Sequence, residues 1–335
     1  MLIPQKPKKE KNASAATTAA AAIDFDCSAH IVDFTAPVIQ QIILTIQGHT
    51  ILTAGSLLVL TGKPKARKST FLHTFLGVAA KTTTLWGITA QLPTTQKKVI
   101  LIDTEQSLYD LHSSVKRMAF NFDIDLTDTS LFQVYSSRTL ALFNLIQLIE
   151  AILENNKDCG LLAIDGLIDL CNDINDVKEA KAAITFIKQI ADKYSIGVIG
   201  VLHQNKGTNF SLGHLGSFAS RFAQSELSVT KNEDNTSTLE GVFLRSAESI
   251  QPITITWDNT NNRYDSVDAL RSKSITSNNL AVQIFGSDLQ LSYAELVNRV
   301  MQITGSTQYA ATKKIIPELY DLGYIHKVGN YIVLK

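Results

Sequence analysis

The residues best suited to chemistry stand together in the stretch GKPKARKST, from Gly62 to Thr70. An apolar run precedes this stretch and a helix-like segment follows it, so the predicted order is strand, loop and helix. In that order, backbone N–H groups and a helix N-terminus surround phosphate groups. Lys68 would reach the β- and γ-phosphates, and the hydroxyl of Ser69 would bind Mg²⁺. A basic turn that binds no nucleotide is the alternative. The predicted phosphate-binding loop consists of Gly62, Lys63, Pro64, Lys65, Ala66, Arg67, Lys68, Ser69 and Thr70.

One position departs from the common pattern G-x-x-x-x-G-K-[ST], which has glycine where this chain has Arg67. A side chain at this position could crowd a backbone that has to approach phosphate closely. It could instead add a cation to a loop that already contains Lys63 and Lys65. The departure puts the rate of hydrolysis in question more than the fold.

Two carboxylates follow apolar runs further along the chain. Glu105 could orient or deprotonate the water that attacks a γ-phosphate, with Asp103 as the neighbouring alternative and helix capping as the non-catalytic one. Asp165 closes a second apolar run, where a hard anion would hold Mg²⁺ beside Ser69. Because Gly166 follows Asp165, the catalytic carboxylate has to come from another strand, and Glu105 fits.

A polar pair, His203 and Gln204, ends a third apolar run. Such a pair could hydrogen-bond the γ-phosphate and report its loss, or it could merely cap the strand. We do not expect His203 to bind a metal, because no Cys, His or carboxylate stands at ligand spacing from it.

Alternating elements would position these residues. Apolar runs predict strands at 57–60, 99–103, 161–165 and 198–202, with helices at 68–79, 108–120, 140–154 and 176–193 between them. This alternation predicts an α/β fold with a mainly parallel sheet and crossover helices. Residues 207–216 are rich in Gly, Ser and Asn and predict a mobile loop. The later segments 227–230, 239–244 and 253–257 predict antiparallel hairpins that extend the sheet.

The remaining segments complete the predicted domain organisation. We expect a disordered basic and Ala-rich tail at 1–22, an ATPase-like core at 23–265, a polar linker at 266–279 and a small domain at 280–335. The tail lacks the Leu/Val-rich core of a secretory signal.

The sequence of the small domain predicts two helices followed by a hairpin. Ser292 and Glu295 form a capping box at the start of the first helix, and Gly323 ends the second. This order resembles a winged helix-turn-helix, and a protein-docking domain of the same shape is the alternative. The near-neutral charge is weak support for DNA binding. The second helix would present Gln308, Lys313 and Lys314.

The composition of the 335-residue chain sets further bounds. Hydrophobic residues make up 45% and charged residues 19%, which predicts one large or two ordinary folded domains. The formal net charge is zero, so only a local patch would attract nucleic acid. Three widely spaced cysteines without a C-x-x-C pair argue against a zinc site and fit a reducing, cytoplasmic location. No apolar run approaches the ~20 residues that span a bilayer, so no membrane partner is expected.

Taken in order, the pair Lys68-Ser69, then Asp-Thr-Glu105, Asp165 and the pair His203-Gln204 resemble the RecA-like ATPases. The branch that looks most similar is the RepA-like group of hexameric replicative helicases and related ATPases of plasmids, phages and mobile elements. The resemblance covers roughly residues 34–264. It implies a RecA-type core that binds ATP and Mg²⁺, with Glu105 as the catalytic base, Asp165 as the Mg²⁺-associated acid, and His203 with Gln204 as the sensor.

The resemblance also implies partners. It implies a homo-oligomer, such as a hexameric ring or a filament, with ATP between subunits and the loop 206–216 on single-stranded DNA. A neighbouring subunit would supply a cation to the γ-phosphate. Arg245 is the first candidate, and Arg221 and Lys231 are alternatives.

The expected function is therefore a Mg²⁺-dependent oligomeric ATPase acting on DNA, as a single-strand helicase or loader, with replication or mobilisation proteins as further partners. The alternative is an adaptor that is not a motor and that bound nucleotide switches between two states. A recombinase-like filament is disfavoured, because no oligomerisation strand is evident before the core.

Overall fold

The computed structural model describes residues 28, 31–35, 37, 39–204, 213–286 and 288–335. The chain divides into two units, residues 1–39 and residues 40–335. The tail expected at 1–22 and the part of the expected loop at 206–212 lie outside the described residues. Within the first unit, the side chain of Asp33 accepts hydrogen bonds from the backbone and hydroxyl of Thr35.

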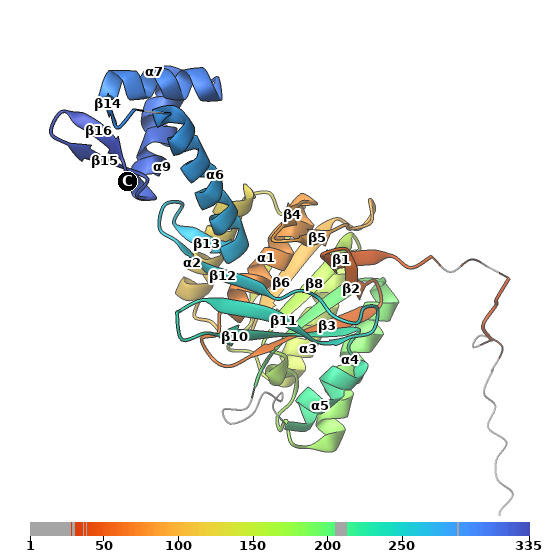
Figure 1. Ribbon diagram of the computed structural model, residues 1–335. Helices are drawn as coiled ribbons and strands as arrows, with labels where there is room; N and C mark the ends of the chain where they lie inside the picture. The colour runs from red at the N-terminus through yellow and green to blue at the C-terminus, as the bar shows by residue number, and fades with distance from the viewer. Residues whose placement is uncertain (1–27, 29–30, 36, 38, 205–212, 287) are drawn as a thin grey trace, which may run out of the picture. The chain divides into compact units, whose positions relative to one another are not determined.

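A nine-stranded sheet forms the centre of the second unit (Figure 1). Its order is β13-β12-β11-β10-β3-β9-β8-β6-β7, and the strands from β10 to β7 run parallel. Strands β11, β12 and β13 continue the sheet antiparallel, which confirms the α/β fold with a mostly parallel sheet. The strands are β3 (Ser56–Gly62), β6 (Lys98–Asp103), β7 (Phe132–Ser136), β8 (Cys159–Asp165), β9 (Gly197–His203), β10 (Ser225–Lys231), β11 (Ser237–Leu244), β12 (Ile253–Asp258) and β13 (Arg263–Ser266).

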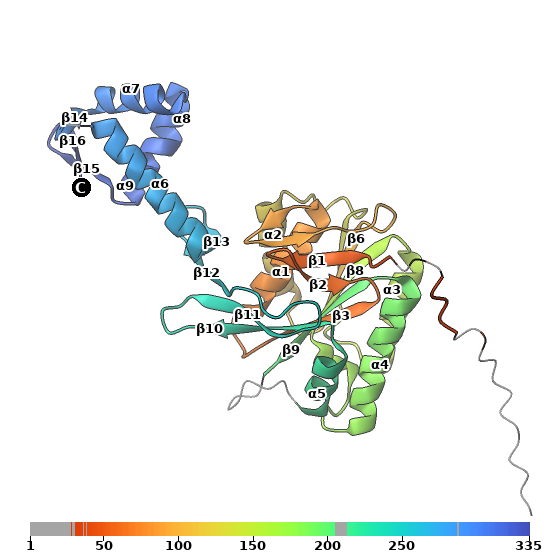
Figure 2. The same cartoon turned by 45° about the vertical axis from the view of Figure 1, so that its right-hand side comes forward.

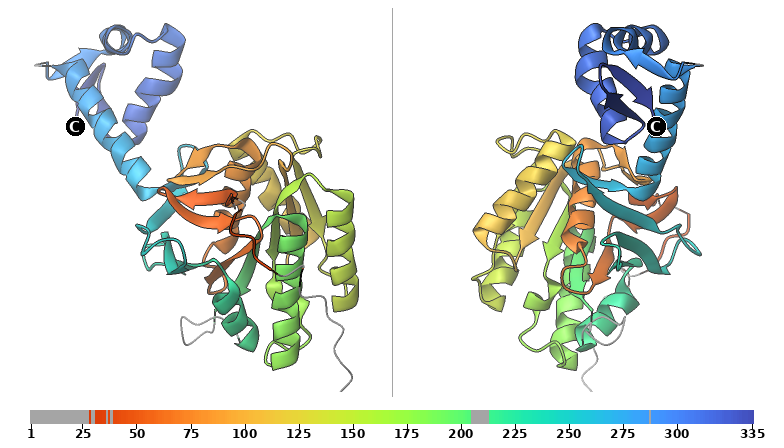
Figure 3. Two further views of the ribbon diagram at one scale, coloured as in Figure 1. Left: turned by 90° about the vertical axis from the view of Figure 1, so that its right-hand side faces the viewer. Right: turned by 60° about the vertical axis from the view of Figure 1, so that its left-hand side comes forward.

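Helices cover both faces of this sheet (Figures 1, 2 and 3). Helices α1 (Lys68–Lys81) and α2 (Leu108–Phe122) pack on one face, and α3 (Leu142–Asn155), α4 (Val177–Tyr194) and α5 (Gly213–Phe222) pack on the other. Successive strand residues point to opposite faces, so Leu58 and Leu60 join the core under α1, whereas Leu57 and Val59 join the core under α4. Burial on both faces explains why these strands are continuous apolar runs.

A second, smaller sheet was not predicted from the sequence. It has the order β2-β1-β5-β4 and packs on the core beneath α1 through residues such as Ile43, Leu52 and Ile88. Its strands are β1 (Ile42–Ile46), β2 (His49–Thr53), β4 (Thr84–Leu85) and β5 (Ile88–Ala90). Such short strands carry little periodicity, so the apolar pattern did not reveal them.

Two expected irregular segments are helical. Residues 267–279, expected as part of a linker, lie in α6 (Val267–Phe285), and Ser266 ends β13. The polar composition suggested irregular backbone, but Ala281, Ile284 and Phe285 at the end of α6 are fully buried and hold the helix by packing. Likewise, residues 213–216 of the expected loop belong to α5.

The C-terminal residues form a small sheet with helices. The sheet has the order β14-β16-β15, and Ser292 and Glu295 make the predicted capping box at the start of α7. Lys313, Lys314 and Gln308 are exposed on the second helix, which contains a π-helical turn at Ala311–Ile315. Whether this region acts as a winged helix stays a prediction. The elements are β14 (Gln290–Ser292), α7 (Tyr293–Thr304), α8 (Gln308–Ala310), α9 (Ile316–Asp321), β15 (Ile325–Val328) and β16 (Tyr331–Leu334).

No helix among the described residues combines the length and apolar character that crossing a membrane requires.

Candidate nucleotide site

The carboxyl ends of four adjacent strands carry the residues singled out in the sequence. The sheet order β3-β9-β8-β6 places the loop after β3 beside His203, Asp165 and Asp103, which end β9, β8 and β6. In open parallel sheets, ligands bind at this edge. Glu105 lies two residues beyond β6. The fold therefore brings Lys68, Ser69, Glu105, Asp165 and His203 to one place.

Lys68 is the centre of the contacts at this edge. Its Nζ atom donates to the carbonyl oxygens of Gly62 and Lys63, at 3.0 and 3.3 Å, and lies 3.1 Å from Nδ1 of His203. Burial lowers the pKa of Lys68, whereas the charges of Glu105 and Asp165 raise it. The ammonium group is therefore held by two backbone carbonyl groups of the loop and by the side chain of His203.

His203 joins Lys68 to Glu105. Its Nε2 atom lies 3.1 Å from Oε2 of Glu105. Since an ammonium group can only donate, Nδ1 of a neutral His203 accepts from Lys68, and Nε2–H donates to Glu105; this hydrogen-bond network assigns the tautomer. The hydrogen bond from His203 lowers the pKa of Glu105, and the charge of Lys68 lowers it further, against partial burial. Glu105 is therefore held as a carboxylate.

Ser69 and Asp165 meet on the other side of the loop. Oγ of Ser69 lies 3.4 Å from Oδ2 of Asp165. Burial, with the charges of Asp103 and Glu105, raises the pKa of Asp165 to about 7. A hydroxyl and a carboxylate at this spacing are hard oxygen donors that suit Mg²⁺, which takes few protein ligands and keeps its remaining positions for water and phosphate. The residues present therefore fit Mg²⁺ bound to a nucleotide.

Two other predicted residues point elsewhere. Asp103, the alternative to Glu105, accepts from the backbone N–H groups of Glu105 and Gln106, at 3.1 and 2.7 Å, and thereby fixes the turn that carries Glu105. The amide of Gln204 donates to the hydroxyls of Thr61 and Ser228, at 3.2 and 2.9 Å. Of the polar pair at the end of β9, His203 alone contacts Lys68 in the described part of the chain.

Gly166 explains why no carboxylate follows Asp165. Its φ angle is +113°, and a Cβ atom there would lie 2.1 Å from Oγ1 of Thr104. That hydroxyl also donates to the carbonyl oxygen of Asp165, at 3.0 Å. A side chain at this position would therefore displace the Thr104 hydroxyl and disrupt its hydrogen bond to Asp165.

The side chain of Arg67 extends away from the phosphate-binding loop. Its backbone adopts φ 74° and ψ 31°, the left-handed conformation for which the common pattern has glycine. Its guanidinium group contacts Tyr264, Ser237 and the carbonyl oxygen of Asn235. Among the described residues, the guanidinium group therefore hydrogen-bonds to the strands after the loop and not to Lys68 or Ser69.

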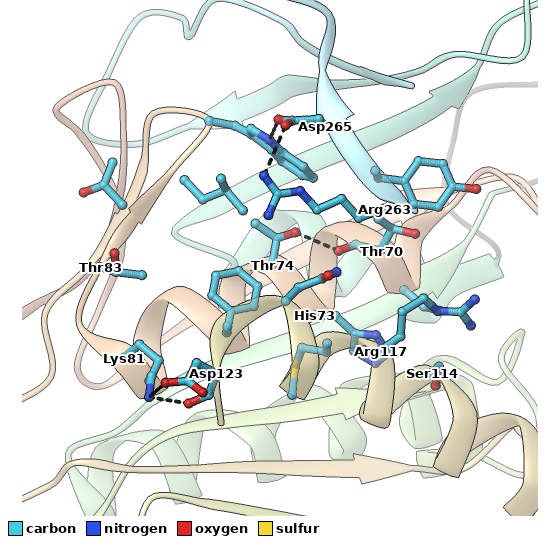
Figure 4. Close-up of a pocket in the computed structure, with 18 residues that line it drawn as sticks. Thr70, His73, Thr74, Lys81, Thr83, Ser114, Arg117, Asp123, Arg263 and Asp265 are labelled. Atoms are coloured by element: carbon cyan, nitrogen blue, oxygen red, sulfur yellow. Dashed lines mark hydrogen bonds and ion pairs between the residues drawn. The ribbon is translucent and has the colours of Figure 1, made fainter. Parts of the chain in front are cut away.

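A cavity of about 720 Å³ adjoins the loop along α1 (Figure 4). Its volume is in the range of about 300–1,000 Å³ that is typical of small-molecule sites. Figure 4 shows Arg263 and Asp265 of β13 across the cavity from Ser114 and Arg117 of α2. Trp86 donates to Asp265 at 2.9 Å and closes a further side. From α1, the lining residues include Ser69, Thr70, His73, Thr74 and Lys81.

Sequence reasoning missed this cavity. Ser114, Arg117 and Asn121 are spaced at i, i+3 and i+7 on α2, which could have indicated a shared helix face. Arg263 and Tyr264 are far away in the sequence, and no local pattern ties them to the loop.

The candidates for a cation supplied to a neighbouring subunit are dispersed. Arg245 follows β11 at the edge of the sheet opposite the loop, because Leu244 pairs with Ser225 whereas the loop end pairs with Val229. Its guanidinium donates to the carbonyl oxygens of Ala223 and Arg221. Lys231, at the other end of β10, lies at the loop edge, and Arg221 is exposed near the end of α5.

Together, the fold and this edge define an α/β nucleotide-binding protein of the P-loop class. Residues 36–209 match the model of the AAA domain family, a match that includes the loop, Glu105, Asp165 and the pair at the end of β9. Because the match covers more than half of the chain, the protein belongs to this family of RecA-like P-loop NTPases, which includes RepA-type proteins. Among curated proteins, no match to the chain is found.

Proposed function

We propose that the protein is a Mg²⁺-dependent ATPase that works as a homo-oligomer on single-stranded DNA. The observation that supports this most is the chain of contacts from Lys68 through His203 to Glu105, beside the Ser69–Asp165 pair. Phosphoryl transfer depends on positioning and on charge stabilisation, and these residue types supply both.

Each residue has a role in this proposal. Lys68 binds the β- and γ-phosphates, and Ser69 with Asp165 holds Mg²⁺. Glu105 orients and deprotonates the attacking water. When bound, Mg²⁺ would supply positive charge to the phosphate oxygens. His203 responds to the γ-phosphate, because the three donors of Lys68 already contact Gly62, Lys63 and His203, and a bound phosphate would have to replace one of these acceptors.

The cavity along α1 is proposed to hold the nucleoside. It opens beside Ser69 and Thr70, where the α-phosphate of a bound nucleotide would lie, and its wall includes aromatic and cationic side chains. Aromatic faces and cations suit a purine base and its ribose.

The oligomeric and DNA-related parts of the proposal rest on the likeness to RepA-type proteins. A hexameric ring would place ATP between subunits, with Arg245, Arg221 or Lys231 of a neighbour reaching the γ-phosphate. The segment 206–216, whose last four residues begin α5, and a winged helix near the C-terminus would contact DNA. The protein would then act as a helicase or a loader, with replication or mobilisation proteins as partners.

The experiment that tests this proposal measures steady-state ATP hydrolysis with and without single-stranded DNA. Lys68→Ala is the blank, and Lys178→Ala, an exposed lysine of α4, is the matched control. DNA-stimulated turnover supports the motor. Tight ATP binding with negligible, DNA-insensitive turnover supports a nucleotide-switched adaptor instead. Unchanged turnover in Lys68→Ala would contradict the assignment of the loop.

A further inference from the structure

Arg67 occupies a backbone conformation that is unfavourable for residues with a Cβ atom. It is the N-cap residue of α1, with φ 74° and ψ 31°, and no side-chain hydrogen bond caps the helix there. A residue with a Cβ atom is strained in this left-handed region, so glycine is the usual choice. Something in the surrounding structure must therefore stabilise arginine at this position.

The guanidinium group supplies that stabilisation. Its Nε atom donates to the hydroxyl of Tyr264 at 3.0 Å, and Nη1 donates to the hydroxyl of Ser237 at 3.0 Å and to the carbonyl oxygen of Asn235. The guanidinium carbon also lies 5.1 Å from the centre of the Tyr264 ring, within the range of a cation–π interaction. A planar fork with several fixed donors can make these contacts together, whereas a lysine cannot.

These partners lie on one side of β3, and His203, Asp165 and Glu105 lie on the other. In the sheet order, β9, β8 and β6 follow β3 in one direction, whereas β10, β11 and β13 lie in the opposite direction. Ser237 begins β11, Asn235 lies in the turn before it, and Tyr264 belongs to β13. The guanidinium group therefore points away from His203 and Glu105.

We propose that Arg67 is a positioning residue that ties the phosphate-binding loop to the antiparallel strands through Tyr264, Ser237 and Asn235. The tie replaces the glycine of the common pattern: it holds the strained backbone in place and keeps the side chain out of the phosphate site. Tyr264 also lines the cavity beside the loop, so the same tie fixes the loop relative to one wall of that cavity. This inference rests on the proposed nucleotide site.

The test compares three substitutions in the full-length protein, with a fluorescent ATP analogue and Mg²⁺ as the probe. Arg67→Ala keeps the strain and loses the tie, so its dissociation constant should rise about tenfold. Arg67→Gly loses both and should stay within about threefold of the original protein. Arg67→Lys keeps the charge but not the fork, so it should resemble Arg67→Ala. Arg138→Ala, at an exposed position before α3, is the control for loss of an arginine.

The opposite order would overturn the proposal. If Arg67 bound phosphate directly, Arg67→Lys would retain binding, and Arg67→Gly and Arg67→Ala would lose it equally. Tyr264→Phe keeps the ring and removes the acceptor, so it should weaken binding about threefold in the original background and have no effect in Arg67→Gly. An equal effect in both backgrounds would contradict the tie.

A ligand-free measurement separates this inference from the proposed function. Urea unfolding without nucleotide should rank Arg67→Ala below both Arg67→Gly and the original protein, and equal midpoints would overturn the tie. If the original protein bound no ATP, the nucleotide proposal would fail, and this ranking would still decide whether Arg67 ties the loop to the strands.

Discussion

Nε2 of His203 lies 3.1 Å from Oε2 of Glu105, and the two residues come from neighbouring parts of one sheet edge, although 98 positions separate them in the sequence. The same imidazole contacts Lys68 through its other nitrogen. A single ring therefore connects the lysine proposed to bind the γ-phosphate with the carboxylate proposed to activate water. Loss of the γ-phosphate would alter both contacts at once.

Replacing Glu105 with Gln should abolish hydrolysis and preserve binding. The amide keeps the size of the side chain and loses the charge and basicity, so turnover should fall by roughly 100-fold or more. Single-turnover hydrolysis and equilibrium binding of ATP measure the two effects. Glu150→Gln, on the exposed face of α3, is the matched control and should leave both unchanged. Surviving turnover in Glu105→Gln would mean that the base is another residue.

The two residues at the end of β9 should behave differently when truncated. His203→Ala removes the link between Lys68 and Glu105, and turnover should fall about 10- to 100-fold while the unfolding free energy changes little. Gln204→Ala removes the buried amide that donates to the hydroxyls of Thr61 and Ser228, although Thr61 keeps its bond to the carbonyl oxygen of Leu227. The loss of these two hydrogen bonds should cost about 1–3 kcal/mol of stability. Turnover assays and urea unfolding on both variants give the comparison. A larger loss of turnover in Gln204→Ala would make Gln204 the sensor.

The sequence was sufficient to predict the residues at the strand ends. A phosphate-binding loop is a local pattern, and carboxylates or polar pairs that close apolar runs meet at one edge once the strands are parallel. These patterns alone predict that Lys68, Asp165 and His203 lie together.

What the sequence could not reveal depends on contacts between distant segments. Arg67 appeared either to crowd the loop or to add charge to it, because nothing local indicates that Tyr264, 197 positions away, accepts its hydrogen bond. The helix α6 was hidden in a similar way, since its polar composition conceals the packing of Ile284 and Phe285 that holds it. In both cases tertiary packing decided what propensity could not.

Gly166 should be far less tolerant of substitution than another glycine whose φ angle is positive. Gly166→Ala combines a positive φ with a Cβ atom 2.1 Å from Thr104, so we expect a loss of about 2–4 kcal/mol of unfolding free energy. Gly48→Ala is the control, because its φ is +82° but nothing lies within 4 Å of the added Cβ, and its cost should be about 1 kcal/mol. Equal losses in urea unfolding would show that the contact with Thr104 relaxes without cost.

His73 should make stability depend on pH in a way that a single substitution reveals. Burial, with the charge of Arg117, lowers its pKa to about 4 from the ordinary 6.5, and its Nε2 atom has no hydrogen-bond partner among the described residues. Between these values the unfolded chain binds the proton and the folded protein does not. Its contribution to stability is therefore lost as pH falls from 6.5 to 4, by about 3 kcal/mol in full.

Asp165 titrates with the opposite sign, since its pKa is raised to about 7, so the pH dependence of the whole protein's stability does not by itself report on His73. The difference between the original protein and His73→Leu isolates the effect. Urea unfolding at pH 7.5 and pH 5 should show a smaller loss in His73→Leu, whereas His112→Asn, at an exposed position of α2, should follow the original protein. An identical loss in His73→Leu would show that His73 gains its proton without unfolding.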